Sequence, residues 1–130
     1  MQLFKTHTDD RGIIEEICKN ADVLRITSKI GSRRASHYHK ATGHWCLVTR
    51  GSLTYFARPV NSQEKPTKKV YYKDDIFWTP PMEEHLMVFD EFNDNEFLCF
   101  STGDRSQSNY EADLVRIEHK LDEIFYSTVV

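Results

Sequence analysis

The fold of this chain is decided by the stretch Gly31-Ser-Arg-Arg-Ala-Ser-His-Tyr-His-Lys-Ala-Thr-Gly-His-Trp-Cys-Leu-Val-Thr-Arg-Gly51, which contains His37 and His39. Alternate side chains of a β-strand point to the same face, so these two imidazoles are expected to lie side by side. A third histidine, His85, follows Pro80-Pro81-Met-Glu-Glu well downstream. Two imidazoles on one face and a third from a distant strand can converge on a divalent metal ion or on a small anionic ligand.

This arrangement resembles the first of the two sequence motifs of the cupin superfamily. The motif is a glycine, a His-x-His pair, a glutamate and a second glycine at fixed spacing. Gly31, His37, His39 and Gly51 fall in register with it, and His44 stands at the glutamate position.

The second cupin motif is matched less fully. Pro80 and His85 stand at its proline and its histidine, whereas Asp74 and Met82 replace its two glycines. The resemblance runs from Asp22 to Phe100 and implies an all-β fold, the cupin β-sandwich or jelly-roll barrel.

Short runs of branched and aromatic residues predict strands along most of the chain. The predicted strands are Gly12–Cys18, Asp22–Ile30, Trp45–Arg50, Leu53–Val60, Lys69–Tyr72, Asp75–Thr79, Leu86–Phe89 and Glu96–Ser101. Many short strands, separated by turn residues and without helices between them, indicate an antiparallel sandwich or barrel.

The C-terminal stretch allows two interpretations. Apolar residues recur at intervals of three or four from Leu114 to Ile124, which favours an amphipathic helix beginning at Asn109 and capped by Asn109 or Ser108. The alternative is a last strand, Asp113–Ile117. The apolar tail Phe125–Val130 predicts packing on a neighbouring subunit and, together with apolar outward faces and the habit of cupins, a homodimer.

Composition bounds the remaining possibilities. A chain of 130 residues suits one domain, residues 1–130, and 39% hydrophobic with 28% charged residues is ordinary for a globular protein. A net charge of −3 without a Lys/Arg run predicts no nucleic-acid partner, and no apolar stretch reaches the roughly 18 residues of a membrane span. Three widely spaced cysteines make a disulfide framework unexpected, and the cytoplasm is the expected location.

Imidazole ligands favour Zn, Fe, Ni or Cu over Ca and Mg. The candidate metal ligands are His37, His39, His44 and His85. If His44 replaces a carboxylate in the ligand set, the site keeps a charge near that of the bare ion and favours anionic or enolate-like oxygen ligands. The alternatives are that His44 faces a substrate while the other three bind metal, or that no metal binds and the histidines line an organic ligand pocket.

Three short segments resemble cupins that process nucleotide-linked deoxysugars. Asp10–Glu15 is similar to the Asp-x-Arg-Gly opening of the epimerases and 3,4-ketoisomerases, and His37–Lys40 looks like the His-x-His-Lys of the ketoisomerases. Asn109–Arg116 resembles a Tyr-Glu-x-Asp-x-x-Arg segment of small cupins encoded with surface-polysaccharide pathways. The resemblance implies an isomerase or epimerase whose small-molecule substrate is a nucleotide-linked keto-deoxysugar.

That chemistry needs a base, an acid and cations for the diphosphate. The resemblance would make His37 or His39 the base and Tyr55 the acid. Arg25, Lys40 and His44 are the candidate substrate-binding residues. Two other functions stay open: a metal-dependent dioxygenase or decarboxylase acting on a small organic acid, and a non-catalytic module that binds a carbohydrate or a small anion.

Overall fold

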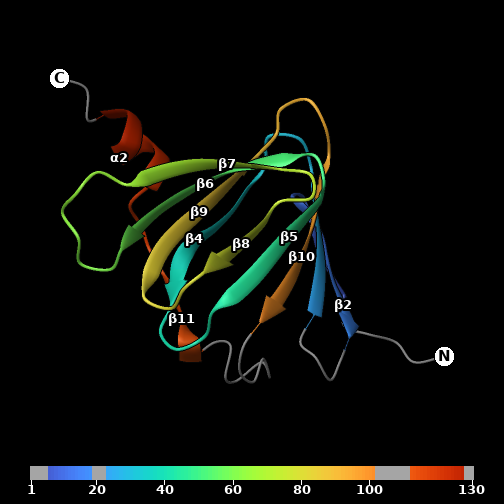
Figure 1. Ribbon diagram of the computed structural model, residues 1–130, viewed down its shortest axis with the longest axis horizontal. Coiled ribbons are helices and arrows are strands. Elements are labelled where there is room, and N and C mark those ends of the chain that lie inside the picture. The colour runs from blue at the N-terminus through green and yellow to red at the C-terminus, as the bar shows by residue number, and fades with distance from the viewer. Residues whose placement is uncertain (1–5, 19–22, 102–111, 128–130) are drawn as a thin grey trace.

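Two antiparallel β-sheets pack face to face in the computed structural model, which describes residues 6–18, 23–101 and 112–127 (Figure 1). The strands are β1 (Thr6–Asp9), β2 (Gly12–Cys18), β3 (Val23–Ser28), β4 (Arg33–His39), β5 (His44–Arg50), β6 (Ser52–Pro59), β7 (Thr67–Tyr72), β8 (Ile76–Thr79), β9 (Glu83–Phe89), β10 (Asn95–Ser101) and β11 (Leu114–Arg116). A short helix, α2 (Leu121–Ser127), follows them. The all-β prediction and the predicted strands are confirmed, with boundaries that differ by at most three residues, apart from Asp22, which lies outside the described residues.

The order of strands in the sheets places distant segments side by side. One sheet has six strands in the order β1-β2-β3-β10-β5-β8, and the other has five in the order β11-β4-β9-β6-β7. Strands β4 and β9, which carry the His-x-His pair and the third histidine, are therefore direct neighbours. The C-terminal strand β11 pairs with the outer edge of β4 and so adjoins the same histidines.

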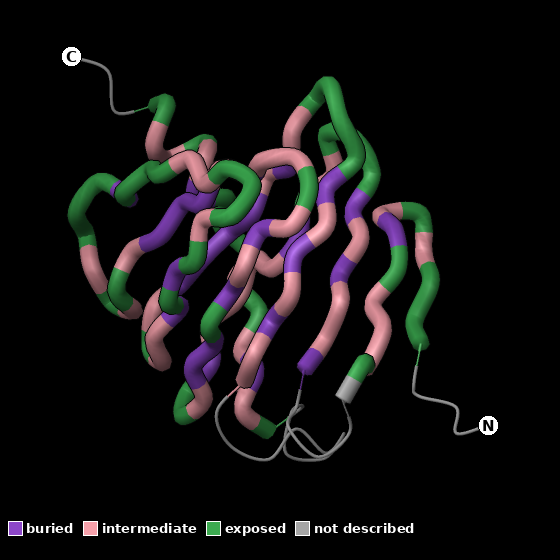
Figure 2. Tube along the Cα trace, turned by 45° about the vertical axis from the view of Figure 1, so that its right-hand side comes forward, coloured by how far each residue is buried: buried purple, intermediate pink, exposed green. Residues whose placement is uncertain are grey.

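The core lies between the sheets, and burial alternates along the strands (Figure 2). On β5, Cys46 and Val48 are buried while Trp45 is exposed, as the alternation of side chains along a strand requires. The inward residues pack into one cluster: Ile26, Cys46, Val48, Leu53, Tyr55, Ala57, Phe77, Met87, Phe89, Phe97 and Cys99. The histidine strands thus lie beside this apolar cluster.

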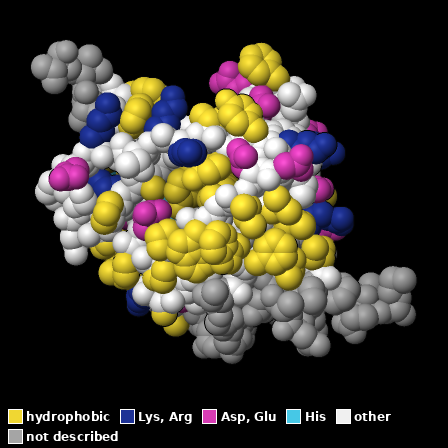
Figure 3. Space-filling view, in the orientation of Figure 1, with side chains coloured by type: hydrophobic (Ala, Val, Ile, Leu, Met, Phe, Trp, Pro, Cys, Tyr) yellow, Lys and Arg dark blue, Asp and Glu magenta, His cyan; other side chains and the backbone are white. Residues whose placement is uncertain are grey.

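The outward face of β5 and β8 is also apolar. Trp45 and Trp78 are cross-strand partners whose ring centroids lie 5.1 Å apart, and Ile76 on the same edge strand is exposed. Figure 3 shows hydrophobic side chains gathered over the region where these strands lie in Figure 1. The expected homodimer stays a prediction.

The C-terminal segment contains both a strand and a helix. Residues 114–116 form the short strand β11 on the open edge of β4, which agrees with the alternative strand Asp113–Ile117. The favoured helix is confirmed only from Leu121, so its predicted start at Asn109 was wrong for residues 114–116. The proposed caps at Ser108 and Asn109 lie outside the described residues. No helix of the described part of the chain is long and apolar enough to cross a membrane.

Helix α2 covers the outer face of the five-stranded sheet. Leu121 is fully buried and packs with Phe56 and Leu86. Phe125, which was expected to lie against a neighbouring subunit, contacts Phe56 of its own chain with ring centroids 5.7 Å apart. The last residues, 128–130, lie outside the described part of the chain.

Candidate metal centre

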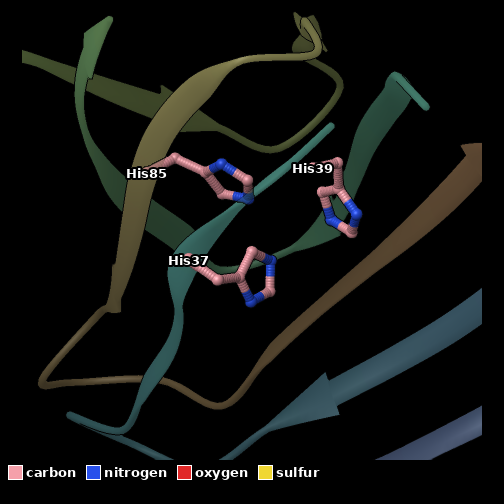
Figure 4. A group of neighbouring side chains, drawn as sticks. All are labelled: His37, His39 and His85. Carbon is pink, nitrogen blue, oxygen red and sulfur yellow. The ribbon is translucent and has the colours of Figure 1, made fainter. Parts of the chain in front are cut away.

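Three histidine rings converge inside the sandwich (Figure 4). His37 on β4 and His85 on β9 are direct cross-strand partners, and His39 lies two residues further along β4. One ring nitrogen from each lies within 4.8 Å of the others. His39 and His85 are buried and His37 is partly buried. The spacing of the sequence therefore predicted this cluster.

A bulge in β4 directs the cluster into the cavity. The pairing of β4 with β9 shifts register between Ala35 and His37, and both Ala35 and Ser36 have positive φ angles, 72° and 62°. An extra residue in one strand reverses the alternation of side chains beyond it. As a result Arg34, which strict alternation would place on the opposite face from His37, also lines the cavity.

Hydrogen bonds fix the orientation of two of the rings. Nδ1 of His39 lies 3.0 Å from Oδ2 of Asp113, and Nδ1 of His85 lies 3.0 Å from the backbone oxygen of Glu83. Because a carboxylate and a carbonyl oxygen can only accept, both Nδ1 atoms donate, and Nε2 is the nitrogen that each ring offers to an ion. Metal-binding histidines generally have this support.

The protonation states also suit a metal. Burial, reinforced by the neighbouring imidazoles, lowers the pKa of His37 well below its ordinary value, and burial lowers the pKa of His85 to about 3. Neutral imidazoles keep the nitrogen lone pair that a metal needs. The buried triad of His37, His39 and His85 can hold a metal ion, and its ligand type fits Zn, Fe, Ni or Cu.

His44 lies beside the triad. Its ring centroid is 4.4 Å from that of His39, and it lines the same cavity. Its Nδ1 lies 2.8 Å from the Ser101 hydroxyl and 3.4 Å from the Cys99 sulfur. The group whose ligand atoms converge within 4.8 Å comprises the other three histidines. The position favours the alternative in which His44 faces a ligand.

Asp113, which directly precedes β11, fixes the ring of His39 through the hydrogen bond to its Nδ1. Its carboxylate also accepts hydrogen bonds from the Thr42 hydroxyl and, at 2.7 Å, from the Ala41 amide. Burial would raise the pKa of Asp113, but the hydrogen bonds, led by that from Thr42, hold it below its ordinary value. A charged carboxylate therefore fixes the tautomer of His39.

Replacing Asp113 with asparagine is expected to weaken Zn²⁺ binding by about 10- to 100-fold. The amide removes the charge that stabilises a protonated Nδ1 and can present a donor to it. Competition with a chromophoric chelator measures the affinity. Asp122→Asn is the matched control, because Asp122 pairs with Arg33 on the surface. An equal loss in both variants would contradict the role of Asp113.

The cavity beside the triad has a volume of about 220 Å³ and mixes apolar and cationic walls. Its apolar wall includes Ile14, Leu24, Ile26, Met87 and Leu114. Its cations are Arg11, Arg34 and Arg116. These walls suit a ligand that has both an anionic group and an apolar part.

Arg34 is the most buried of these arginines. Its Nε donates to the Ser28 hydroxyl at 2.8 Å and its Nη2 donates to the Thr27 carbonyl at 3.2 Å. No carboxylate of the described residues forms an ion pair with it. Burial and the nearby Arg11 lower its pKa. A buried positive charge of this kind is stabilised by an anion, so Arg34 favours an anionic ligand.

Three residues proposed from the sequence do not reach the cavity. Tyr55 is buried behind His85, with the two rings stacked at 5.8 Å, and its hydroxyl bonds to Thr79 and Glu83. Burial raises the pKa of Tyr55 far above its ordinary value, so a role as the acid is not supported. Tyr55 is not among the described residues that line the cavity.

The two proposed diphosphate-binding cations are also placed elsewhere. Arg25 points outward from β3 and makes a two-point ion pair with Glu15. Lys40 is exposed just beyond the end of β4, and neither residue is among those that line the cavity. Three arginines do line it, Arg11, Arg34 and Arg116, and the sequence predicted none of them as a substrate contact.

The two-sheet β-sandwich with its short C-terminal helix matches known cupin structures. The chain superposes on capsular polysaccharide assembling protein CapF of Staphylococcus aureus with a TM-score of 0.80 and 21% identity over 89% of its length. It matches oxalate decarboxylase of Lactobacillus farciminis, in a formate complex, with a TM-score of 0.70 and 14% identity over 95% of its length. The CENP-C cupin domain of Drosophila melanogaster matches over 76%, with a TM-score of 0.63 and 15% identity.

These likenesses establish the cupin fold. The chain spans 34% of the length of CapF, 38% of the decarboxylase and 75% of the CENP-C domain. No family model matches the chain, and no curated protein sequence matches it.

Proposed function

We propose that this protein is a metal-dependent isomerase or epimerase that acts on a nucleotide-linked keto-deoxysugar. The observation that carries the proposal is the juxtaposition of His44 with the supported triad of His37, His39 and His85 in a cavity lined by arginines. A divalent ion held by the triad would supply Lewis-acid polarisation of a carbonyl group. The chain would supply the groups that move the proton and hold the anion.

His44 is the proposed proton carrier. His37 and His39, proposed from the sequence as bases, would hold the metal ion in this proposal, which leaves His44 in the same cavity to carry the proton. An imidazole can take a proton from the carbon next to a carbonyl group and return one near neutral pH. The Ser101 hydroxyl at its Nδ1 would keep the ring in place.

The arginines are the proposed anion contacts. Arg34 and Arg116 lie on the neighbouring strands β4 and β11 of one sheet, and Arg11 lies just before β2 of the other, so both sheets contribute guanidinium groups to the cavity wall. Guanidinium groups bind phosphate oxygens in pairs of hydrogen bonds. A cavity of about 220 Å³ is smaller than the roughly 300 Å³ at which drug-sized pockets begin, so the sugar would occupy it and the nucleotide would extend outside.

The likeness to CapF supports the choice of substrate class. CapF is described as a capsular polysaccharide assembling protein, and the chain superposes on about a third of it. The sequence segments Asp10–Glu15 and Asn109–Arg116 resemble sugar-processing and polysaccharide-associated cupins independently. We therefore propose a role in surface-polysaccharide synthesis, in the cytoplasm.

Exchange of substrate protons with solvent tests the proposal. Metal-loaded protein, incubated in D₂O with dTDP- or UDP-linked 4-ketosugars, is expected to introduce deuterium at a carbon next to the carbonyl group, as NMR would show. His44→Asn should lower the exchange rate by about 100-fold or more while metal stoichiometry is retained. Absence of exchange in every ketosugar, with metal bound, would refute the proposed activity.

A decarboxylase or dioxygenase acting on a small organic acid is the second candidate. The small cavity with a buried arginine fits a carboxylate, and the chain superposes on oxalate decarboxylase over 95% of its length. This candidate predicts CO₂ release or O₂ consumption that requires a redox-active metal. Zn²⁺-loaded protein would be inactive if it is a decarboxylase or dioxygenase, but active if it is a sugar isomerase.

A further inference from the structure

Two buried thiols face each other across neighbouring strands at the cavity wall. Cys99 on β10 is the direct cross-strand partner of Cys46 on β5. The two residues are 6% and 1% exposed, and both line the cavity. Because directly paired residues project to the same face of a sheet, both side chains point inward.

Backbone hydrogen bonds show which type of pair they form. The Val48 amide donates to the Asp75 carbonyl at 3.0 Å, and the Val48 carbonyl accepts from the Asp74 amide at 2.8 Å. The polar backbone groups of Val48 thus point away from β10, toward the β8 side. This direction repeats every second residue, so the backbone groups of Cys46 also point toward β8, where its partner is Phe77.

The pair of Cys46 and Cys99 is therefore the non-hydrogen-bonded kind. In such pairs the Cα atoms are about 4.5 Å apart and the side chains are at their closest. Disulfides need Cα separations of about 4.4 to 6.8 Å. This separation lies within the window, so a disulfide can form between the two side chains without a shift of the strands.

We propose that Cys46 and Cys99 form a reversible dithiol–disulfide site, oxidised by hydrogen peroxide that enters through the cavity. One thiolate attacks a peroxide oxygen, the O–O bond breaks, and a sulfenic acid and one water are formed. The second sulfur then attacks the sulfenic sulfur, which forms the S–S bond and releases a second water. Two thiols lose two electrons and two protons, and one peroxide becomes two waters.

Oxidation would act on the candidate metal centre through His44. The Cys99 sulfur lies 3.4 Å from Nδ1 of His44, which adjoins His39. A disulfide would draw this sulfur toward Cys46 and remove its S–H group. The inference stands on strand pairing and burial and does not depend on the proposed sugar chemistry.

Peptide mapping after oxidation tests the proposal. Cys18→Ser leaves Cys46 and Cys99 as the two cysteines of the chain. This variant is treated with graded hydrogen peroxide, quenched with catalase, unfolded and alkylated with N-ethylmaleimide. We expect a monomer lighter by two hydrogens, no alkylation, a linked peptide pair, and full reversal by dithiothreitol. The melting temperature of the oxidised protein should rise, because the cross-link constrains the unfolded chain.

The matched controls are the same variant with Cys46→Ser or Cys99→Ser added. Each should keep one thiol that alkylates or oxidises further, and neither should give a linked peptide within one chain. Two thiols that stay alkylatable, or that reach sulfinic acid without a linked peptide, would overturn the proposal. The same mapping on the unsubstituted chain covers the case in which Cys18→Ser does not fold, and a link to Cys18 there would also overturn it.

Discussion

Replacing His85 with alanine is expected to reduce the affinity for Zn²⁺ by more than about 100-fold, the upper end of what loss of a supporting residue costs. His85 offers one of three converging nitrogens, and its Nδ1 is held by the Glu83 carbonyl. Two imidazoles with open positions bind a divalent ion much more weakly than three. Elemental analysis of untagged protein, followed by chelator competition, measures both the stoichiometry and the affinity.

His7→Ala is the matched control for this prediction. His7 is exposed on β1 and contacts Asp9, so its loss also removes one imidazole from the chain but none from the triad. Near one equivalent of metal in this control, and almost none in His85→Ala, is the expected pair of results. Equal metal content in the two variants, both folded by circular dichroism, would show that the triad is not the metal site.

Replacing Gly12 with alanine is expected to cost at least about 3 kcal/mol of unfolding free energy. Gly12 begins β2 with a φ angle of +143°, a region that side chains rarely adopt. A Cβ atom there would overlap the backbone carbonyl of Thr27 on β3. Backbone on the neighbouring strand cannot rotate away, so the strand pairing itself must shift. Urea unfolding of the two proteins measures the difference.

Gly31→Ala separates this clash from the general cost of a positive φ angle. Gly31 has a φ of +68° in a turn, and a Cβ there meets nothing within 4 Å. The expected cost is about 1 kcal/mol, that of the left-handed conformation alone. An equal loss of unfolding free energy in both variants would show that the close approach of Gly12 to Thr27 does not determine the cost of the substitution.

The strands could be predicted because alternation is a local property of the sequence. Each β-strand needs only its own side chains to show which face is buried. The C-terminal segment differed, because Leu114 and Ile117 recur at a helical spacing, yet β11 forms there. A strand forms at residues 114–116 because they pair with the open edge of β4. This edge lies 70 or more residues away in the sequence, so a local pattern cannot predict the pairing.

The histidines of the candidate site could be predicted from the sequence, whereas the residues around them could not. Asp113 is 74 residues from His39, so no spacing rule links them, although Asp113 lies in the segment Asn109–Arg116 that resembles small polysaccharide-associated cupins. Arg34 was hidden by the bulge in β4, which reverses the alternation that the sequence implies. Tyr55 was wrongly predicted to be the catalytic acid because β9 lies between β4 and β6. The pattern of a single strand does not predict the order of strands in a sheet.

The paired indoles of Trp45 and Trp78 are the two tryptophans of the chain. Both lie on the outward face of β5 and β8, on the opposite side of the sheet from the histidines. Intrinsic fluorescence will therefore report what covers that face, and ring coupling should add a signal to the circular dichroism spectrum. Occupancy of the cavity has to be followed by another probe, such as the ultraviolet charge-transfer or visible d–d bands of Co²⁺ substituted at the triad.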